Sequence, residues 1–196
     1  MAGTPRTLPS RSTLELIRSD LKVFAAGEGK PVTWKLTLRM IFLMPGFQFV
    51  LSRRIQDFLY GIPVVGRGLG RVWWWWTCRS FGCEIAIGAK VGASFYTPHP
   101  TGIVLGVCTI GDGVTILQNV TIGKKSKLVA GTPVICDGAY LAAGAVILGD
   151  IRVGVGAAVG ANSVLMCDVP DGCFAVGAPA RVKVRDNVRA APATVR

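Results

Sequence analysis

The sequence predicts a mainly β fold, a solenoid of short parallel strands, preceded by an N-terminal α-helical region. Three observations support this prediction. Aliphatic residues recur at every sixth position over most of the C-terminal half of the chain. Glycine and alanine are frequent between those positions, as tight corners require. Apolar residues with helical spacing occur instead within residues 13–26 and 33–60, in segments broken at proline or glycine.

The aliphatic repeat runs in two blocks with one interruption between them. Its positions are Val104, Ile110, Ile116 and Ile122, then Ile135, Leu141, Ile147, Val153, Val159 and Leu165. A period of six fits neither a helix of about 3.6 residues per turn nor a continuous strand with a period of two. It fits three short strands per coil, with the aliphatic side chains inside a triangular prism. A single coil would leave its apolar face in water, so the coils must stack.

The limits of the solenoid follow from the same repeat. Ile85 and Val91 begin the prism, and the segment 177–184 closes it. We therefore expect three regions: a helical, basic and tryptophan-rich region at 1–83, a β-helix domain at 84–184 and a flexible tail at 185–196.

Charge is concentrated in the N-terminal part. The chain carries 22 Lys plus Arg and 11 Asp plus Glu, a net charge of +11, and residues 1–84 hold twelve of the basic and five of the acidic residues. No helix-turn-helix, zinc or RNA-binding signature accompanies this charge, so we expect no nucleic-acid partner. An anionic membrane surface or a phosphorylated ligand is the expected contact.

The sequence indicates a cytoplasmic protein, with peripheral attachment at the inner face of the membrane left open. The six cysteines form no CxxC pair, and the first residues lack the apolar core of a signal peptide. The longest uncharged apolar run, Met40 to Leu51, is interrupted by Pro45 and is too short to span a bilayer, which takes about 20 residues. Tryptophan and arginine do favour the headgroup region.

Several motifs carry a resemblance to a known family. The segment from Ile110 to Arg181 resembles the hexapeptide-repeat acyltransferases, whose fold is a left-handed parallel β-helix and usually trimeric. A closer similarity, to the serine acetyltransferase type and its exopolysaccharide relatives such as the colanic acid acetyltransferases, runs from about Pro45 to Val184. It rests on PGFQFVLSRRIQDFL, FGCEIAIGAKVG, HPTGIVLG, VTILQNVTIG, LAAGAVILGDIRVGVGAAVGANSVL and DVPDGCFAVGAPARV.

The single histidine suits this branch of the fold. Carbonic anhydrases of this fold need three histidines, and nucleotidyltransferase fusions need a preceding glycine-rich α/β domain, so neither matches. By the resemblance, His99 in YTPHPTG is the base that takes the proton of an acceptor hydroxyl. Glu84 stands where the family usually has an Asp that orients this histidine. The resemblance implies acetyl-CoA as donor and no metal.

The family binds acetyl-CoA in the groove between subunits, where small side chains line the coils, so a homotrimer with intersubunit sites is expected. The positions that match its acetyl-CoA contacts are Gly123, Ala143, Ala161, Arg181 and Lys183. Corner geometry alone also selects Gly and Ala in such coils.

Three serine-reading features of the family are absent. Pro98 replaces the Asp before the histidine, Gly131 and Thr132 replace an Arg-His pair, and residues 32–45 hold no acid. A zwitterion without these partners would lose charge-assisted hydrogen bonds that contribute about 1.5–3 kcal/mol each. We therefore expect a sugar acceptor, free or lipid-linked, in polysaccharide biosynthesis. L-Serine O-acetylation in cysteine biosynthesis and a non-catalytic scaffold are the alternatives.

Two further segments allow more than one role. Trp73 to Trp76 can pack internally, anchor at a membrane interface or stack on sugar, and at most about two of the four rings can share a surface. Lys124 to Lys127 fill the interruption of the repeat, as a solvated loop or as a gate over the phosphates of CoA or an acidic acceptor.

Overall fold

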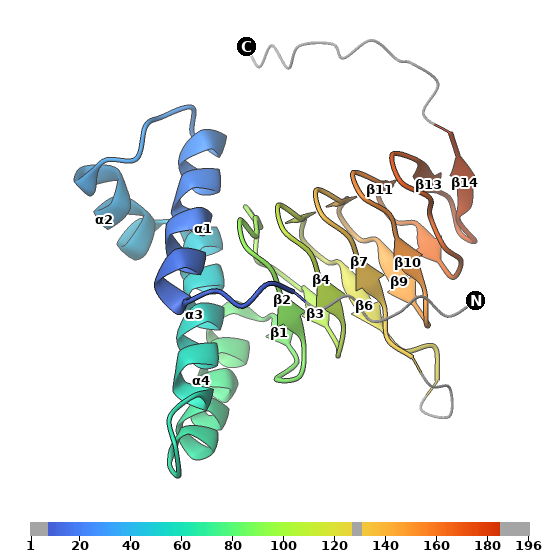
Figure 1. Cartoon of the computed structure of the whole chain (residues 1–196). Helices are drawn as coiled ribbons and strands as arrows, with labels where there is room; N and C mark the ends of the chain where they lie inside the picture. Colours follow the sequence, from blue (N-terminus) through green and yellow to red (C-terminus); the bar gives the residue numbers. More distant parts are fainter. Residues whose placement is uncertain (1–7, 127–130, 185–196) are drawn as a thin grey trace.

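Four helices stand at one end of a triangular β-solenoid in the computed structural model of the chain (Figure 1). The structure describes residues 8–126 and 131–184. Within these residues no helix has both the length and the apolar character needed to cross a bilayer.

The helices begin and end at recognisable signals. Ser12 and Glu15 form a reciprocal capping box at the first helix, Thr33 caps the second, and Pro45 occupies the first turn of the third. The fourth ends at Gly82, whose φ of 60° lies in the left-handed region. The bounds are α1 Thr13–Gly27, α2 Trp34–Leu43, α3 Pro45–Tyr60 and α4 Gly66–Phe81.

Helix α4 was not predicted, because three glycines and four consecutive tryptophans obscure its periodicity. Its glycines have a packing reason. A Cβ atom at Gly70 would lie 2.5 Å from the ring of Tyr60, so glycine lets α3 and α4 approach closely. Helical spacing within 33–60 does not locate the buried face of α3 completely: Phe58, which fits that spacing, is 59% exposed, and Arg53 and Arg54 are buried.

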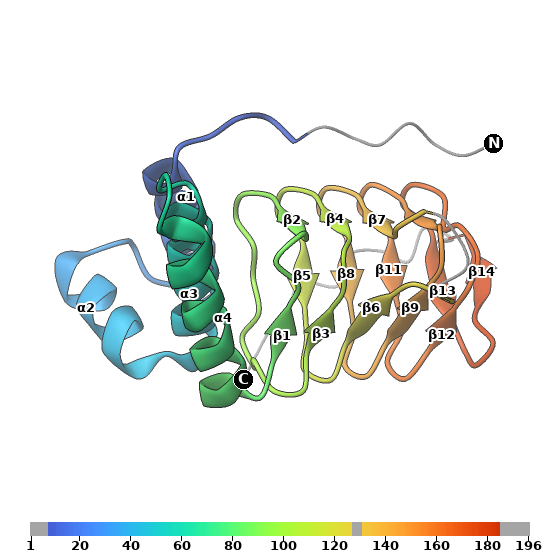
Figure 2. The same ribbon diagram turned by 90° about the horizontal axis from the view of Figure 1, so that it is seen from below.

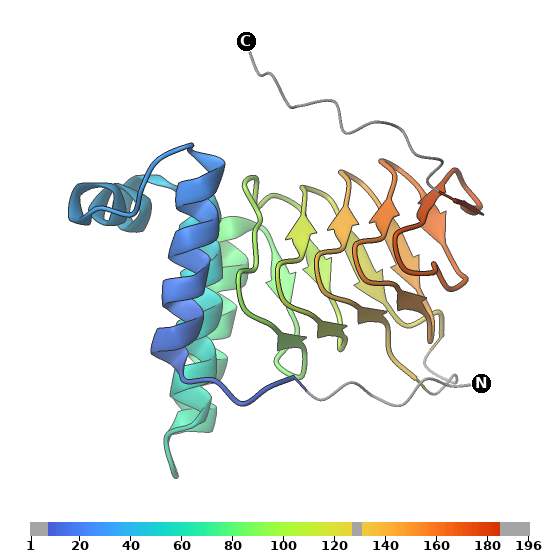
Figure 3. The same cartoon turned by 45° about the horizontal axis from the view of Figure 1, so that its top comes forward.

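The solenoid has three parallel sheets that form the faces of the prism (Figures 2 and 3). One contains β1-β3-β6-β9-β12, another β10-β7-β4-β2, and the third β14-β13-β11-β8-β5, where only β13 and β14 pair antiparallel. The strand bounds are β1 Glu84–Ile85, β2 Lys90–Val91, β3 Val104–Leu105, β4 Thr109–Ile110, β5 Thr115–Ile116, β6 Thr121–Gly123, β7 Val134–Ile135, β8 Tyr140–Leu141, β9 Val146–Leu148, β10 Arg152–Val153, β11 Ala158–Val159, β12 Val164–Leu165, β13 Phe174–Val176 and β14 Arg181–Lys183.

The predicted period of six describes the interior. Nine of the ten aliphatic repeat positions are 1% exposed or less, and the tenth, Val104, is 41% exposed because its neighbour Leu105 points inward instead. The positions four residues after the repeat are buried too, including Ala139, Ala145 and Ser163. Each coil therefore directs two side chains per hexad inward, a large one and a small one.

Two buried arginines join the helices to the first coil. Arg54 is fully buried, forms an ion pair with Asp20 at 2.8 Å, and donates to the backbone oxygens of Val91 and Gly92. Arg53 donates to Ala89 O at 2.7 Å. Because carbonyl groups of the first coil would otherwise face an apolar helix, the arginines satisfy them and fix the coil against α3.

Two of the four consecutive tryptophans pack internally and two are exposed, because four successive side chains cannot all point the same way. Trp73 donates to Ser52 O at 3.0 Å, and Trp74 donates to Ile85 O at 3.1 Å, so these two rings fasten α4 to α3 and to the first coil. Trp75 and Trp76 are 58% and 46% exposed.

Candidate active site

The turn that carries His99 is held by backbone contacts while the histidine side chain itself is exposed. Before the turn, Tyr96 pairs with Thr115 of the next coil. Within it, Thr101 N donates to His99 O at 2.9 Å, and after it Thr101 O accepts from Asn119 N at 2.8 Å. The imidazole is thus exposed on a turn whose backbone is held by hydrogen bonds.

The N-terminus of α3 packs closely against the same turn. A Cβ atom at Gly46 would lie 2.3 Å from Thr97 O and 3.0 Å from Pro98 O, so only glycine allows this contact. Pro45 starts the helix immediately before it. The helical region therefore positions the backbone next to His99, a role that the sequence analysis did not assign to any residue.

Hydrogen bonds between turns place three of the predicted residues, His99, Ala143 and Ala161, along one edge of the prism. The turn at Thr101 accepts from Asn119, Gln118 O accepts from Gly144 N at 2.9 Å, and Ala143 O accepts from Asn162 N at 2.9 Å. These bonds stack the turns of successive coils, so the His99 turn lies on the same edge as Ala143 and Ala161. This is a continuous path from the imidazole along the solenoid.

Glu84 begins β1, pairs with Val104 in the adjacent coil and is exposed. Within the described residues no hydrogen bond or ion pair connects its carboxylate to the imidazole of His99. The structure therefore does not show the orienting contact, although catalytic hydrogen bonds often tighten only when substrate binds. The preceding Cys83 is buried, and burial raises the pKa of its thiol, so this sulfur stays protonated and is a poor nucleophile.

Gly123 differs from the glycines that form corners. A Cβ atom at Gly111 would lie 2.3 Å from the carboxylate of Asp137, so corner packing explains that glycine. At Gly123 the first atom met is in Leu148, at 3.9 Å, an ordinary contact. Packing within the chain therefore does not require glycine at position 123, and its place on the path of acetyl-CoA stays a prediction.

Arg181 and Lys183 lie in β14, exposed, at the far end of the solenoid. Five strand pairings separate Tyr96, beside the His99 turn, from β14, which corresponds to about 24 Å at ~4.8 Å per pairing. The structure therefore places the two cations far from the His99 turn, and their contact with acetyl-CoA stays a prediction.

Two buried oxygens near the turn were also not predicted from the sequence. Thr97 Oγ1 and Gln118 Oε1 are buried, and neither has a hydrogen-bond partner in the described part of the chain. An unpaired buried polar atom costs about 1–3 kcal/mol. Residue spacing gave no signal for them, because their burial depends on how coils stack.

The structure describes part of the lysine segment that follows β6. Lys124 and Lys125 are exposed after β6, whereas Lys127 lies outside the described residues. Among the residues that the structure describes, no group of three or more His, Cys, Asp or Glu side chains could hold a metal ion.

Comparison with known proteins identifies the family. No family model matches the chain. A Staphylococcus aureus serine acetyltransferase is 36% identical over 180 residues, covering 90% of this chain and 81% of that protein. A Synechococcus elongatus serine acetyltransferase is 35% identical over 159 residues, covering 79% of this chain and 64% of that protein. This chain thus spans less than two thirds of the latter.

Solved structures give the same result. Serine acetyltransferase from Neisseria gonorrhoeae matches with a TM-score of 0.76 and 32% identity, over 88% of this chain and 65% of that one. The soybean apoenzyme matches with a TM-score of 0.76 and 34% identity, over 88% and 69%. A serine acetyltransferase solved in complex with CoA matches with a TM-score of 0.76 and 31% identity, over 88% of this chain and 70% of that one.

These matches confirm the predicted fold, a left-handed β-helix behind an N-terminal helical region, and correct the predicted acceptor. The relatives are named serine acetyltransferases, so the expectation of a sugar acceptor in polysaccharide biosynthesis, free or lipid-linked, is wrong. That expectation rested on Pro98, Gly131 and Thr132, where the family's serine-binding residues are absent, and this absence did not justify it. The chain belongs to the serine acetyltransferase family of hexapeptide-repeat acyltransferases.

Proposed function

We propose that this protein is an acetyl-CoA-dependent L-serine O-acetyltransferase. The observation that carries the proposal is a serine acetyltransferase relative with 36% identity over 90% of this chain. The exposed His99 turn on the edge that also carries Ala143 and Ala161 supports it, because a base and a path for a long thioester lie together there.

The reaction needs one base, which His99 supplies. The imidazole takes the proton of the serine hydroxyl as the hydroxyl oxygen attacks the thioester carbonyl carbon of acetyl-CoA. When the carbon–sulfur bond breaks, the thiolate of CoA receives the proton from the imidazolium. The products are O-acetylserine and CoA with a free thiol, and the imidazole is neutral again.

The chain's own contacts define what each part contributes. The contacts of Gly46 and Asn119 fix the backbone around His99, which limits the motion of the base and favours a reactive geometry. Glu84 accepts a hydrogen bond from the imidazole in the assembled site and stabilises its cationic form. Gly123 leaves room for the pantetheine arm.

The active form in this proposal is a homotrimer with the site between subunits. Exposure of the His99 side chain supports it, because a neighbouring chain would cover that edge. Acetyl-CoA is a cytoplasmic metabolite, so the enzyme acts in the cytoplasm.

The test is thiol release from acetyl-CoA with L-serine, together with mass spectrometry of the acetylated product. L-Alanine, which lacks the hydroxyl, is the matched acceptor control. The wild-type protein should release CoA and form O-acetylserine, and His99→Ala should lower kcat by about 100-fold or more. Background-level release at saturating L-serine would contradict the proposed function, and full activity of His99→Ala would contradict the role of the base.

A further inference from the structure

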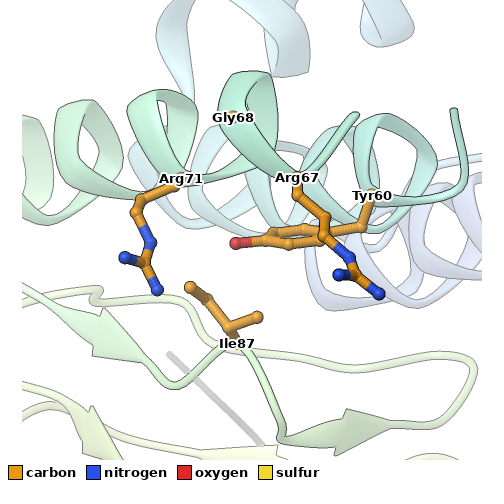
Figure 4. Close-up of a pocket in the computed structure, with 5 residues that line it drawn as sticks. All are labelled: Tyr60, Arg67, Gly68, Arg71 and Ile87. Atoms are coloured by element: carbon orange, nitrogen blue, oxygen red, sulfur yellow. The ribbon is translucent and has the colours of Figure 1, made fainter. Parts of the chain in front are cut away.

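A pocket lies at the opposite end of α3 from the His99 turn. It has a volume of about 520 Å³ and is lined by Tyr60, Arg67, Gly68, Arg71 and Ile87. Figure 4 shows both arginine side chains extending from α4 on the side of the first coil, one on each side of the Tyr60 ring, with the Tyr60 hydroxyl directed toward Arg71. Helix α3 separates this pocket from the turn by roughly 20 Å, at ~1.5 Å per residue.

Among the residues that the structure describes, no acidic side chain neutralises the two arginines. Arg67 and Arg71 are one helical turn apart on the same face of α4, where like charges repel. In the described residues no carboxylate forms an ion pair with either, and no described residue forms a hydrogen bond with the Tyr60 hydroxyl. The segment 61–83 contains no acidic residue at all. Two guanidinium groups and a hydroxyl around one hollow match the oxygens of a phosphate group.

The surroundings of the pocket are apolar and open. Val64 is 100% exposed, Val72 is 66% exposed and Trp75 is 58% exposed. Arg79 lies over the ring of Trp75 at 5.9 Å from its centroid. Figures 1 and 3 show that the turn between α3 and α4 forms a free tip of the helical region, away from the coils. Exposed valine and tryptophan beside unpaired arginine are typical of segments that lie in a lipid headgroup layer.

The backbone at the tip adds a second feature. Val64 has a φ of 65°, a left-handed conformation that is unfavourable for a β-branched residue. The turn nevertheless presents this valine to solvent instead of a glycine or asparagine. An apolar side chain held outward at a strained tip suits insertion between lipid headgroups.

We propose that the face formed by Val64 of the α3–α4 turn and by Arg67, Arg71, Val72, Trp75 and Arg79 of α4 binds the surface of an anionic bilayer, with a phospholipid phosphate in the Tyr60 pocket. Charge complementarity selects this occupant, because the face has three arginines including Arg79 and no acid. The α4 helix would lie along the membrane surface. This inference is independent of the proposed serine acetylation.

The experiment is co-sedimentation of the full chain with vesicles of phosphatidylglycerol and phosphatidylcholine, compared with vesicles of phosphatidylcholine alone. The double variant Arg67→Ala/Arg71→Ala should bind anionic vesicles about 30-fold more weakly, which corresponds to about 1 kcal/mol for each arginine. The matched control is Arg18→Ala/Lys22→Ala, which removes two exposed cations at the same spacing from α1 and should stay within about 3-fold of wild type.

Further measurements distinguish a lipid phosphate from a free phosphate compound and test the contribution of the exposed valines. Binding should weaken strongly at about 1 M salt, and Val64→Ser/Val72→Ser should reduce it about 10-fold at low salt. Equal loss in the α4 and α1 double variants would overturn the proposal, as would equal binding to both kinds of vesicle. Thermal stabilisation by inorganic phosphate, lost in the α4 variant, without vesicle binding would show a site for a free phosphate compound and overturn the lipid assignment.

Discussion

Replacing Gly46 by alanine tests how the helical region positions the base. The added Cβ atom would lie 2.3 Å from Thr97 O and 3.0 Å from Pro98 O. An ordinary carbon contact requires more than 3 Å, so α3 and the turn must separate by about 1 Å. Both neighbours are backbone oxygens and cannot rotate away. The displacement therefore reaches His99, two residues further along the chain.

A displacement of about 1 Å at a catalytic group can lower the rate about 100-fold. We expect kcat for acetyl transfer to L-serine to fall by about that factor, while KM for acetyl-CoA changes little because the distal contacts remain. Overpacking should also lower the free energy of unfolding by about 1–3 kcal/mol, measured by urea denaturation. Steady-state thiol release, at a temperature where the variant is fully folded, separates the two effects.

Gly88→Ala is the control for this experiment. A Cβ atom at Gly88 meets Val107 at 3.4 Å, an ordinary contact, and the residue lies in the first coil away from the turn. Its kcat and urea midpoint should match the wild type. Wild-type kcat in Gly46→Ala, or an equal loss in both variants, would refute the claim that α3 positions the histidine.

Four further variants test other parts of the site and of its support. Gly123→Val should raise KM for acetyl-CoA about 10-fold or more with an unchanged urea midpoint, and an unchanged KM would remove position 123 from the donor path. Glu84→Gln should lower kcat about 100-fold with little change in KM, whereas a rise in KM for serine alone would assign Glu84 to acceptor binding instead of to orienting His99. Asp20→Asn leaves a buried guanidinium without its ion-pair partner and should destabilise the fold by about 3–5 kcal/mol in urea denaturation; a loss below 1 kcal/mol would contradict this. Burial raises the pKa of Cys108 to about 12 from 9.0, so the thiol of the unfolded chain ionises first as pH rises. The free energy of unfolding of the wild type should therefore fall by about 1 kcal/mol between pH 8 and pH 10, and that of Cys108→Ala should not show this fall.

The sequence predicted the solenoid well because its signal is local and repeated. Each hexad places one aliphatic residue inside the prism, so ten positions on one period define the coils without knowledge of distant contacts. Helix α4 could not be predicted in the same way. Its glycines look like breakers, and their actual function, close packing such as that of Gly70 on Tyr60, depends on residues in another helix.

The candidate site was predictable only where chemistry is tied to a motif. His99 lies in a recognisable segment, but nothing near it in sequence indicates that Gly46, some fifty residues earlier, presses on its turn. The buried oxygens of Thr97 and Gln118 likewise depend on stacking between coils. The buried arginines of α3 could not be predicted, because their partners are backbone oxygens of the first coil, which no side-chain pattern reveals.

The acceptor was predicted wrongly because only the charged residues of one chain were considered. Pro98, Gly131 and Thr132 lack the charges that read serine at those positions in the family, and the loss was assigned to the whole site. A zwitterion, however, needs countercharges at the right distance, not at particular positions in a motif. In the proposed homotrimer the site lies between subunits, so two chains contribute side chains to one acceptor. A polar group missing from one loop is therefore no measure of the charge present in the assembled site, and the acceptor has to be tested on the oligomer.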